Sequence, residues 1–330
     1  MNTPINIKPK ALVIGISGQD GSLLAELLLD KGYQVYGTSR RSLENAFERH
    51  KYLHIDNRIN IYQINPLDTD AIFSLINDLK VDEVYMLSAQ SSVSYSVNNV
   101  AETFNSIINT TISLCEAIKK LSNKPKSFFA STSEIFGDSS QPVTLDTRLS
   151  PLNPYAIAKS TANNILRFYR DQYGIPISIG HMFNHESELR GGQYVTRKVA
   201  LAACKAMHGP YPLELGNIDV IRDWGSAREF VLAMWLSLQI DSDKLNENII
   251  CTGVGRSLHD IVAKMYASLG LDWMDYVTIS EKLIRNNDPR IIIGDPSGAK
   301  QSINWKHQLS FEDTIDDLMD RTKLSLDRDW

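Results

Sequence analysis

Short apolar runs alternate with helical patterns through the first half of the chain. Ala11-Leu-Val-Ile-Gly15 is typical of a strand that is buried on both faces. Residues Ser22 to Lys31 place leucines at helical spacing, and Gly32-Tyr33 is typical of the end of such a helix. Because Gln34 to Thr38 then resumes the strand pattern, these segments predict one strand–helix–strand unit.

The same alternation continues to about residue 180. It predicts an α/β fold with a Rossmann-like, doubly wound parallel sheet, in which ligands bind at the carboxyl ends of the strands. The further strands are expected at Ile59 to Ile64, Glu83 to Leu87, Ser127 to Ser131 and Ile177 to His181. The helices between them are expected at Asp70 to Lys80, Glu102 to Lys120 and Tyr155 to Tyr173.

Three glycines occupy the turn between the first strand and its helix, in Gly15-Ile-Ser-Gly18-Gln-Asp-Gly21. Backbone N–H groups in such a turn can approach a pyrophosphate, and the helix amino terminus favours its negative charge. The spacing departs from the usual dinucleotide fingerprint, so a tight turn without a ligand is the alternative. The predicted cofactor contacts here are Gly15, Gly18, Gln19, Asp20 and Gly21.

Arg40-Arg41-Ser42 follows the second strand, where an acidic residue would hold the ribose 2′-hydroxyl of NAD. Two guanidinium groups instead suit a 2′-phosphate, to which they can donate charge-assisted hydrogen bonds. The sequence therefore favours NADP as the cofactor, with Arg40, Arg41 and Ser42 as contacts. A solvated basic turn is the alternative.

Composition and charge narrow the class of protein. The chain has 330 residues and a formal net charge of −5, which gives no support for binding nucleic acid. Its three cysteines lie far apart with no metal-ligand spacing, so we expect reduced thiols, a cytoplasmic location and no metal. No apolar run reaches the length of a membrane-spanning helix, and we expect no membrane association.

A second group of polar residues has the pattern of a hydride-transfer site. Ser131-Thr-Ser-Glu134 ends a predicted strand, and Asn153-Pro154 suits the start of the helix that carries Tyr155 and Lys159. Tyr155 and Lys159 share one helix face, and a positive charge about 4 Å away offsets the roughly 4 kcal/mol cost of a phenolate at pH 7. We therefore predict that Tyr155 is a base. The alternatives are a surface pair, a solvent-facing Glu134 and a Thr132 with only a strand role.

The combination resembles the extended short-chain dehydrogenase/reductase family and, within it, the GDP-mannose 4,6-dehydratases. The glycine turn, the paired arginines and the catalytic segments all match, as does Leu87-Ser-Ala-Gln-Ser91. The most specific matches are Phe183-Asn-His-Glu-Ser187, Arg190-Gly191, Val195-Thr-Arg-Lys198, Gly216-Asn217, Arg222-Asp-Trp-Gly225 and Gly294-Asp-Pro-Ser297. The resemblance extends over nearly the whole chain.

This resemblance implies roles for individual residues. Thr132, Glu134 and Tyr155 would form the catalytic set, supported by Lys159. The remaining contacts to NADP would be Leu87, Ala89, His185 and Arg190, and those to the nucleotide-sugar would be Ser91, Asn184, Lys198, Asn217, Arg222 and Arg285. An ion pair between Arg222 and Asp223, and a structural buried role for His185, are the alternatives.

The reaction implied is a dehydration without net oxidation. Tyr155 would take the C4-hydroxyl proton as hydride leaves C4, Glu134 would take the C5 proton, and water would leave C6 before hydride returns there. The product would be a 4-keto-6-deoxy sugar. Asn65-Pro66 departs from the family's pattern at an adenine contact, so the cofactor contact there stays open. Arg285-Asn-Asn-Asp-Pro289 departs from it on the substrate side, so the identity of the base or sugar stays open. The alternatives are a reductase of GDP-4-keto-6-deoxymannose, a dehydratase or epimerase of another nucleotide-sugar such as a GDP-heptose, and a non-catalytic NADP-binding protein.

Domain organisation and assembly are further expectations. Residues 1–180 should form the NADP-binding domain and residues 181–330 a smaller substrate-binding lobe, with about 218–240 packing back on the sheet. The resemblance implies a homodimer or homotetramer. Residues 43–50, which follow the arginines, are expected to reach a neighbouring subunit's cofactor site.

Overall fold

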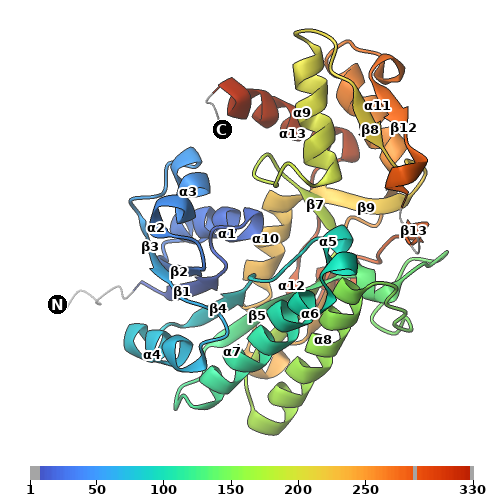
Figure 1. Ribbon diagram of the computed structural model, residues 1–330. Helices are drawn as coiled ribbons and strands as arrows, with labels where there is room; N and C mark the ends of the chain where they lie inside the picture. The colour runs from blue at the N-terminus through green and yellow to red at the C-terminus, as the bar shows by residue number, and fades with distance from the viewer. Residues whose placement is uncertain (1–7, 285–287, 328–330) are drawn as a thin grey trace.

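A parallel sheet of seven strands forms the centre of the protein (Figure 1). The computed structural model describes residues 8–284 and 288–327. The strand order is β10-β6-β5-β4-β1-β2-β3, and every neighbouring pair is parallel. The strands are β1 (Lys10–Ile14), β2 (Gln34–Ser39), β3 (Ile59–Gln63), β4 (Glu83–Met86), β5 (Lys126–Thr132), β6 (Ile177–Met182) and β10 (Glu247–Ile250).

Both faces of this sheet are buried because apolar side chains alternate between two cores. In β1, Ala11 and Val13 belong to one core, whereas Leu12 and Ile14 belong to the other. The first core includes residues of α1 (Gln19–Asp30) and α10 (Ala227–Leu236). The second includes residues of α4 (Thr69–Leu79), α7 (Thr110–Lys119) and α8 (Pro154–Tyr173). The predicted fold class, a doubly wound parallel sheet, is confirmed.

The connections on the two sides of the sheet differ from the predicted pattern in one detail. The helix expected at residues 102–120 consists of α6 (Val100–Phe104), a π-helical turn (Asn105–Asn109) and α7. Some further connecting segments are short: α2 (Leu43–Ala46), α3 (Glu48–Tyr52), α5 (Val93–Asn98) and a 3₁₀ turn at Ser133–Phe136. Asn153 caps α8 and Pro154 is its first residue, as predicted.

A second set of elements packs around its own core beyond the carboxyl ends of the strands. It has the sheet β11-β9-β13, whose β9 also pairs with β7, and the pair β12-β8. These strands are β7 (Asn184–Glu186), β8 (Leu213–Leu215), β9 (Ile221–Ser226), β11 (Gly255–Ser257), β12 (Val277–Ile279) and β13 (Ile291–Ile292). The helices are α9 (Val195–Ala206), α11 (Leu258–Ala267) and α13 (Phe311–Asp327), with 3₁₀ turns at Trp273–Asp275 and Glu281–Leu283. A further 3₁₀ turn, Ser242–Lys244, connects α10 with β10 of the central sheet.

The chain returns to the central sheet after it has entered this second part. α10 packs against α1, β10 extends the central sheet beside β6, and α12 (Ser297–Ile303) packs against β10. The two parts therefore interleave along the sequence, and the predicted boundary at residue 180 stays a prediction. No helix within the described residues is both long enough and apolar enough to cross a membrane.

Candidate active site

A cavity of about 570 Å³ lies where the carboxyl ends of β1, β4, β5 and β6 approach β7, β9 and α9. Its size is in the range of small-molecule binding sites. Most residues predicted for catalysis and binding line it: Gly15, Gly18, Gln19, Asp20, Gly21, Arg41, Leu87, Ala89, Ser91, Thr132, Glu134, Tyr155, Lys159, Asn184, His185, Arg190, Asn217 and Arg222.

The other four predicted residues are placed differently. Arg40 and Ser42 are exposed next to Arg41 and are not part of the cavity wall. The Nζ of Lys198 donates a hydrogen bond to the carbonyl oxygen of Glu214 at 2.8 Å, outside the cavity wall. Arg285 lies outside the described residues. The binding roles of these residues stay predictions.

The glycine turn brings the backbone close to the cavity. Gly15 has a φ of +92°, and a Cβ on Gly21 would lie 2.4 Å from the carbonyl oxygen of Gly15, so a larger residue would push α1 away from β1. Gly18 caps α1 without a side-chain hydrogen bond. The first-turn N–H groups of α1 have no acceptor within the helix and lie at the cavity wall, which fits a dinucleotide diphosphate.

Tyr155 and Lys159 lie close together in a buried environment. Burial raises the pKa of the Tyr155 phenol above its ordinary value, although a hydrogen bond with Thr132 acts in the opposite direction. Burial also lowers the pKa of Lys159 to about 8, against the negative charge of Asp20. The Lys159 Nζ lies 5.9 Å from the centre of the Tyr155 ring and donates to the Ala130 carbonyl at 2.6 Å. The protein's own groups therefore favour the protonated phenol, because burial outweighs the stabilisation that we expected from Lys159.

Glu134 lies in the 3₁₀ turn that follows β5, within the same cavity. Its backbone N–H donates to Thr132 Oγ1 at 3.3 Å, and Asn153 Nδ2 donates to its Oε2 at 3.1 Å. Two of the three predicted catalytic residues, Thr132 and Glu134, are therefore joined through the backbone at the end of one strand. The third, Tyr155, lies in the first turn of the helix that Asn153 caps.

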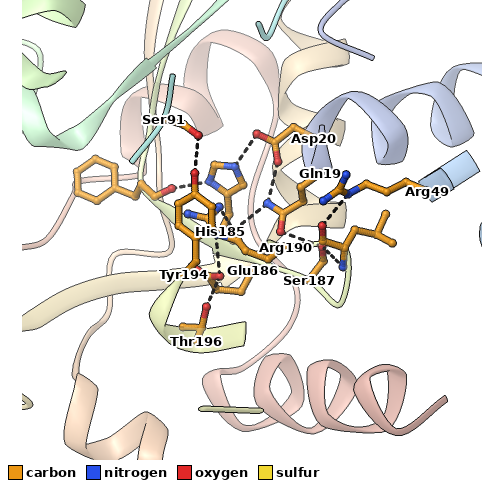
Figure 2. Close-up of polar contacts among 12 residues, drawn as sticks. Gln19, Asp20, Arg49, Ser91, His185, Glu186, Ser187, Arg190, Tyr194 and Thr196 are labelled. Carbon is orange, nitrogen blue, oxygen red and sulfur yellow. Dashed lines mark hydrogen bonds and ion pairs between the residues drawn. The ribbon is translucent and has the colours of Figure 1, made fainter. Parts of the chain in front are cut away.

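Asp20 and His185 form an ion pair at the first turn of α1 (Figure 2). His185 Nδ1 donates to the Phe183 carbonyl at 2.6 Å, and its Nε2 lies 3.0 Å from Asp20 Oδ2. Burial opposes the charge of Asp20, but the charge and hydrogen bond of His185 lower the pKa of Asp20 to about 2. Burial also opposes the charge of His185, but Asp20 raises its pKa. Both ring nitrogens of His185 face acceptors, which favours the imidazolium form.

Arg190 and Tyr194 extend this network across the cavity (Figure 2). The guanidinium of Arg190 donates to the His185 carbonyl at 3.2 Å and lies 3.3 Å from Glu186 Oε2. It also stacks on the Tyr194 ring at 4.3 Å from the ring centre, and the Tyr194 hydroxyl hydrogen-bonds with Ser91 Oγ at 2.7 Å. This chain of contacts connects the second part of the protein with the loop after β4.

The cavity wall also contains residues that were not predicted, among them Arg49 and Tyr194. Arg49 donates to the Ser17 carbonyl at 3.0 Å and to the Leu189 carbonyl at 2.8 Å, so it ties α3 to both sides of the cavity. Tyr194 stands directly before the Val195-Thr-Arg-Lys198 motif, which was the available signal for it. No local pattern marks Arg49, because its role depends on contacts that are distant in sequence.

Three residues that were predicted to bind the nucleotide-sugar, Asn184, Asn217 and Arg222, line the cavity. Arg222 is 5% exposed, and its Nη2 lies 2.7 Å from Asp288 Oδ1. Asp223 does not provide that partner, since its carboxylate accepts hydrogen bonds from Thr252 and from the backbone of Gly253. The alternative that we considered, an ion pair between Arg222 and Asp223, is therefore wrong. Arg222 forms its ion pair with Asp288 instead.

Comparison with known proteins identifies the family. The description "GDP-mannose 4,6 dehydratase" belongs to the family profile that matches residues 12–318. GDP-mannose 4,6 dehydratase 2 of Arabidopsis thaliana is 34% identical, with 97% of this chain and 88% of that protein aligned. The human GDP-mannose 4,6 dehydratase is also 34% identical, with 97% and 92% aligned. The chain belongs to the GDP-mannose 4,6-dehydratase family.

Solved structures more distant than this dehydratase family share the fold. UDP-glucuronic acid 4-epimerase from Bacillus cereus, in complex with UDP-glucuronic acid and NAD, superposes with a TM-score of 0.84 at 22% identity, covering 96% of this chain and 99% of that chain. The dTDP-glucose 4,6-dehydratase from Bacillus anthracis, in complex with NAD, also has a TM-score of 0.84, at 17% identity and with 97% and 98% coverage. At these identities the likeness concerns the fold.

Proposed function

We propose that this member of the GDP-mannose 4,6-dehydratase family converts GDP-mannose to GDP-4-keto-6-deoxymannose. The observation that carries the proposal is the placement of Thr132, Glu134, Tyr155 and Lys159 in one cavity of a chain that matches the family over residues 12–318. The alternatives, a reductase or an epimerase, do not require a carboxylate beside the tyrosine and lysine. Glu134 therefore favours dehydration.

The cofactor that we propose is NADP. The glycine turn and the first turn of α1 would hold its diphosphate, and Arg41, at the end of β2, would meet the 2′-phosphate. His185 and Arg190 supply positive charge near the same turn. When bound, the nicotinamide ring supplies the chemistry of accepting hydride from sugar C4 and returning it to C6. A nicotinamide cofactor is consistent with the structural relatives, whose complexes contain NAD. Our proposal adds that this protein uses the phosphorylated form, NADP.

In the proposed reaction, Tyr155 removes the proton of the C4 hydroxyl. Burial keeps the phenol protonated in the protein itself, so base catalysis requires positive charge near its oxygen when the site is filled. Lys159 contributes to that charge while it is protonated, and its hydrogen bond to Ala130 fixes the ammonium beside the tyrosine. The hydrogen bond with Thr132 acts in the same direction.

Glu134 provides the base for the second proton transfer. A ketone at C4 acidifies the C5 proton, so a carboxylate at the same end of the sheet can remove it and pass a proton to the C6 hydroxyl, which leaves as water. The turn after β5 places Glu134 next to Thr132, which can donate a hydrogen bond to the reacting oxygen. Asn184, Asn217 and Arg222 would hold the nucleotide-sugar from the opposite wall, and Arg222 suits its diphosphate.

A nucleotide-sugar panel tests the proposed function. The purified protein is incubated with a catalytic amount of NADP and one nucleotide-sugar at a time: GDP-mannose, a GDP-heptose, UDP-glucose or dTDP-glucose. The masses of the products are measured by mass spectrometry. We expect loss of one water from GDP-mannose without net consumption of NADPH, and deuterium at C5 when the solvent is D₂O. A requirement for stoichiometric NADPH would support the reductase, a mass-neutral inversion the epimerase, and bound cofactor without turnover the non-catalytic protein.

The variant Glu134→Gln tests the residue that distinguishes dehydration. We expect product formation to fall by about 10²–10⁴-fold because the general base is lost, while GDP-mannose still binds within a few-fold of wild type by calorimetry. Glu312→Gln makes the same chemical change at an exposed position of α13 and should be active. Full activity of Glu134→Gln would remove Glu134 from the proposed mechanism.

Assembly and location remain part of the same proposal. We expect a homodimer or homotetramer in sedimentation at micromolar concentration, and a monomer there would contradict it. The segment expected to reach a neighbour, residues 43–50, includes Arg49, which contacts its own chain at Ser17 and Leu189. The cytoplasmic location rests on the three cysteines, which are all unpaired and buried.

A further inference from the structure

Three side chains of α8 and its cap contact the end of β5. Lys159 Nζ donates to the Ala130 carbonyl at 2.6 Å, and Asn163 Nδ2 donates to Ser131 Oγ at 2.9 Å. Asn153 Nδ2 donates to Glu134 Oε2 at 3.1 Å. The first two contacts end on a backbone carbonyl and a hydroxyl. The third ends on the carboxylate that we propose as the catalytic base.

Asn153 holds this contact with an amide group whose orientation is fixed. Its Oδ1 accepts the backbone N–H of Ala156 at 2.9 Å as the N-cap of α8. A backbone N–H can only donate, so the oxygen of the amide must face Ala156 and the NH₂ group must face Glu134. Asn153 is 7% exposed, and its planar amide has little room to turn. One side chain thus fixes both the start of the helix that carries Tyr155 and the position of the Glu134 carboxylate.

We propose that Asn153 is a positioning residue that sets Glu134 against sugar C5 and keeps the carboxylate ionised for proton removal. A hydrogen bond from a neutral donor favours the charged form of a carboxylate. Because Oε2 is held by Asn153, the geometry of proton transfer does not depend on free rotation of the glutamate side chain. The inference rests on the proposed function, since it assigns Asn153 a role in the elimination step.

Two substitutions separate the cap from the contact with Glu134. Serine and aspartate are both good N-caps, so Asn153→Ser and Asn153→Asp retain the start of α8. Asn153→Ser removes the donor to Glu134. Asn153→Asp replaces that donor with a second carboxylate, and two carboxylates at this distance cannot both ionise easily. Asn163→Ser is the matched control, because it changes another buried amide that joins α8 to β5 without touching Glu134.

Kinetic isotope effects report which chemical step has slowed. We expect kcat of Asn153→Ser to fall about tenfold to a hundredfold, and that of Asn153→Asp to fall further, with thermal unfolding close to wild type. With GDP-[5-²H]mannose the isotope effect on kcat should increase in Asn153→Ser, whereas with GDP-[4-²H]mannose it should not. Asn163→Ser should leave both isotope effects unchanged. A wild-type kcat and C5 isotope effect in Asn153→Ser would overturn the proposal.

A measurement without turnover separates this inference from the proposed function. The Glu134 carboxylate is titrated by ¹³C NMR, with Glu134→Gln to assign its signal, in wild type and in Asn153→Ser. We expect the midpoint to move up when the Asn153 donor is removed, because a hydrogen bond to the carboxylate favours its charged form. If no nucleotide-sugar loses water, the proposed function fails; if the midpoint does not move, the role of Asn153 fails.

Discussion

Lys159 carries its ammonium group at a position that disfavours the charge. Burial lowers its pKa to about 8, although the charge of Asp20 acts in the opposite direction. An unfolded lysine titrates near pH 10.4, so the unfolded chain binds more protons between about pH 8 and pH 10.4. In that window the contribution of this residue to the free energy of unfolding rises with pH, and at pH 7 the folded protein bears the full cost.

We therefore expect Lys159→Met to be inactive but more stable than wild type at pH 7. The gain in the free energy of unfolding should be about 1–2 kcal/mol, because the lost hydrogen bond to Ala130 offsets part of the relief from burying a charge. Urea denaturation without ligands checks this, and the gain should shrink at pH 10.5. Lys300→Met, at an exposed position of α12, should show no such pH dependence. An equal or lower stability of Lys159→Met at pH 7 would contradict the burial cost.

At the residue scale, the sequence indicated which residues form the site better than it indicated which of them contact one another. The pairing of Tyr155 with Lys159 follows from their spacing on one helix, and the Asn153-Pro154 dipeptide identified the helix start. The contact of Asn153 with Glu134 was not predictable, because it joins residues 19 positions apart through the packing of α8 on β5. The protonation preference of Tyr155 also depends on burial, which local spacing does not report.

At the element scale, α9 connects the cavity with α13. Its first turn lines the cavity, while Arg197 lies on its buried side and donates to Thr322 Oγ1 at 2.7 Å and Ser325 Oγ at 2.9 Å. Arg197 is 3% exposed, and burial lowers its pKa. A buried guanidinium that loses an acceptor is costly. The hydroxyls of α13 are therefore expected to support the position of α9.

We expect Thr322→Val to lower the free energy of unfolding by about 1–3 kcal/mol, since valine has the shape of threonine but leaves an Arg197 N–H without this acceptor. Hydrogen exchange should increase in α13 and α9 before it increases in the central sheet. Thr314→Val is the control on the same helix, because its hydroxyl donates only to the neighbouring Ser310 carbonyl. Equal losses of stability in the two variants would argue against the role of Arg197.

The elements themselves were largely predictable where their sequence periodicity was strong. The first six strands of the central sheet and the long helix α8 fall within a few residues of the predicted ranges. The strand β10 was missed, because its four residues join the sheet only through the free edge of β6. The π-helical turn at Asn105–Asn109 was also missed, since an added residue in a helix leaves the apolar pattern on both sides intact.

At the scale of the whole molecule, the cavity unites segments from almost the full length of the chain. The family motifs supplied most of its wall, from the glycine turn near residue 15 to Arg222 in β9. Arg49 was missing from the prediction because it acts by bridging Ser17 and Leu189, which are far apart in sequence. The interleaving of the two parts likewise follows from β10 and α12, whose return to the sheet no local pattern indicates.

The choice between NADP and NAD is also a property of the assembled cavity. Arg41 lies in its wall, whereas the adjacent Arg40 does not, so the two guanidinium groups should contribute unequally to cofactor selection. A ligand at 100 times its Kd adds about 2.7 kcal/mol to the free energy of unfolding, which corresponds to about 4 °C in Tm for a chain of this size. We expect this rise with NADP and a smaller one with NAD at the same concentration.

Alanine substitutions of the two arginines make that preference testable. Arg41→Ala should reduce the rise in Tm with NADP to the value seen with NAD, because in the proposed complex this guanidinium would bind the 2′-phosphate, which NAD lacks. Arg40→Ala is the matched comparison, and it should retain most of the difference between the cofactors. The side chain of Arg41 forms an exposed ion pair with Glu48 at 3.9 Å, and exposed ion pairs contribute little to stability. The substitution should therefore leave the Tm of the protein without cofactor unchanged. Equal shifts with NAD and NADP in the wild-type protein would instead show that the paired arginines are a solvated turn.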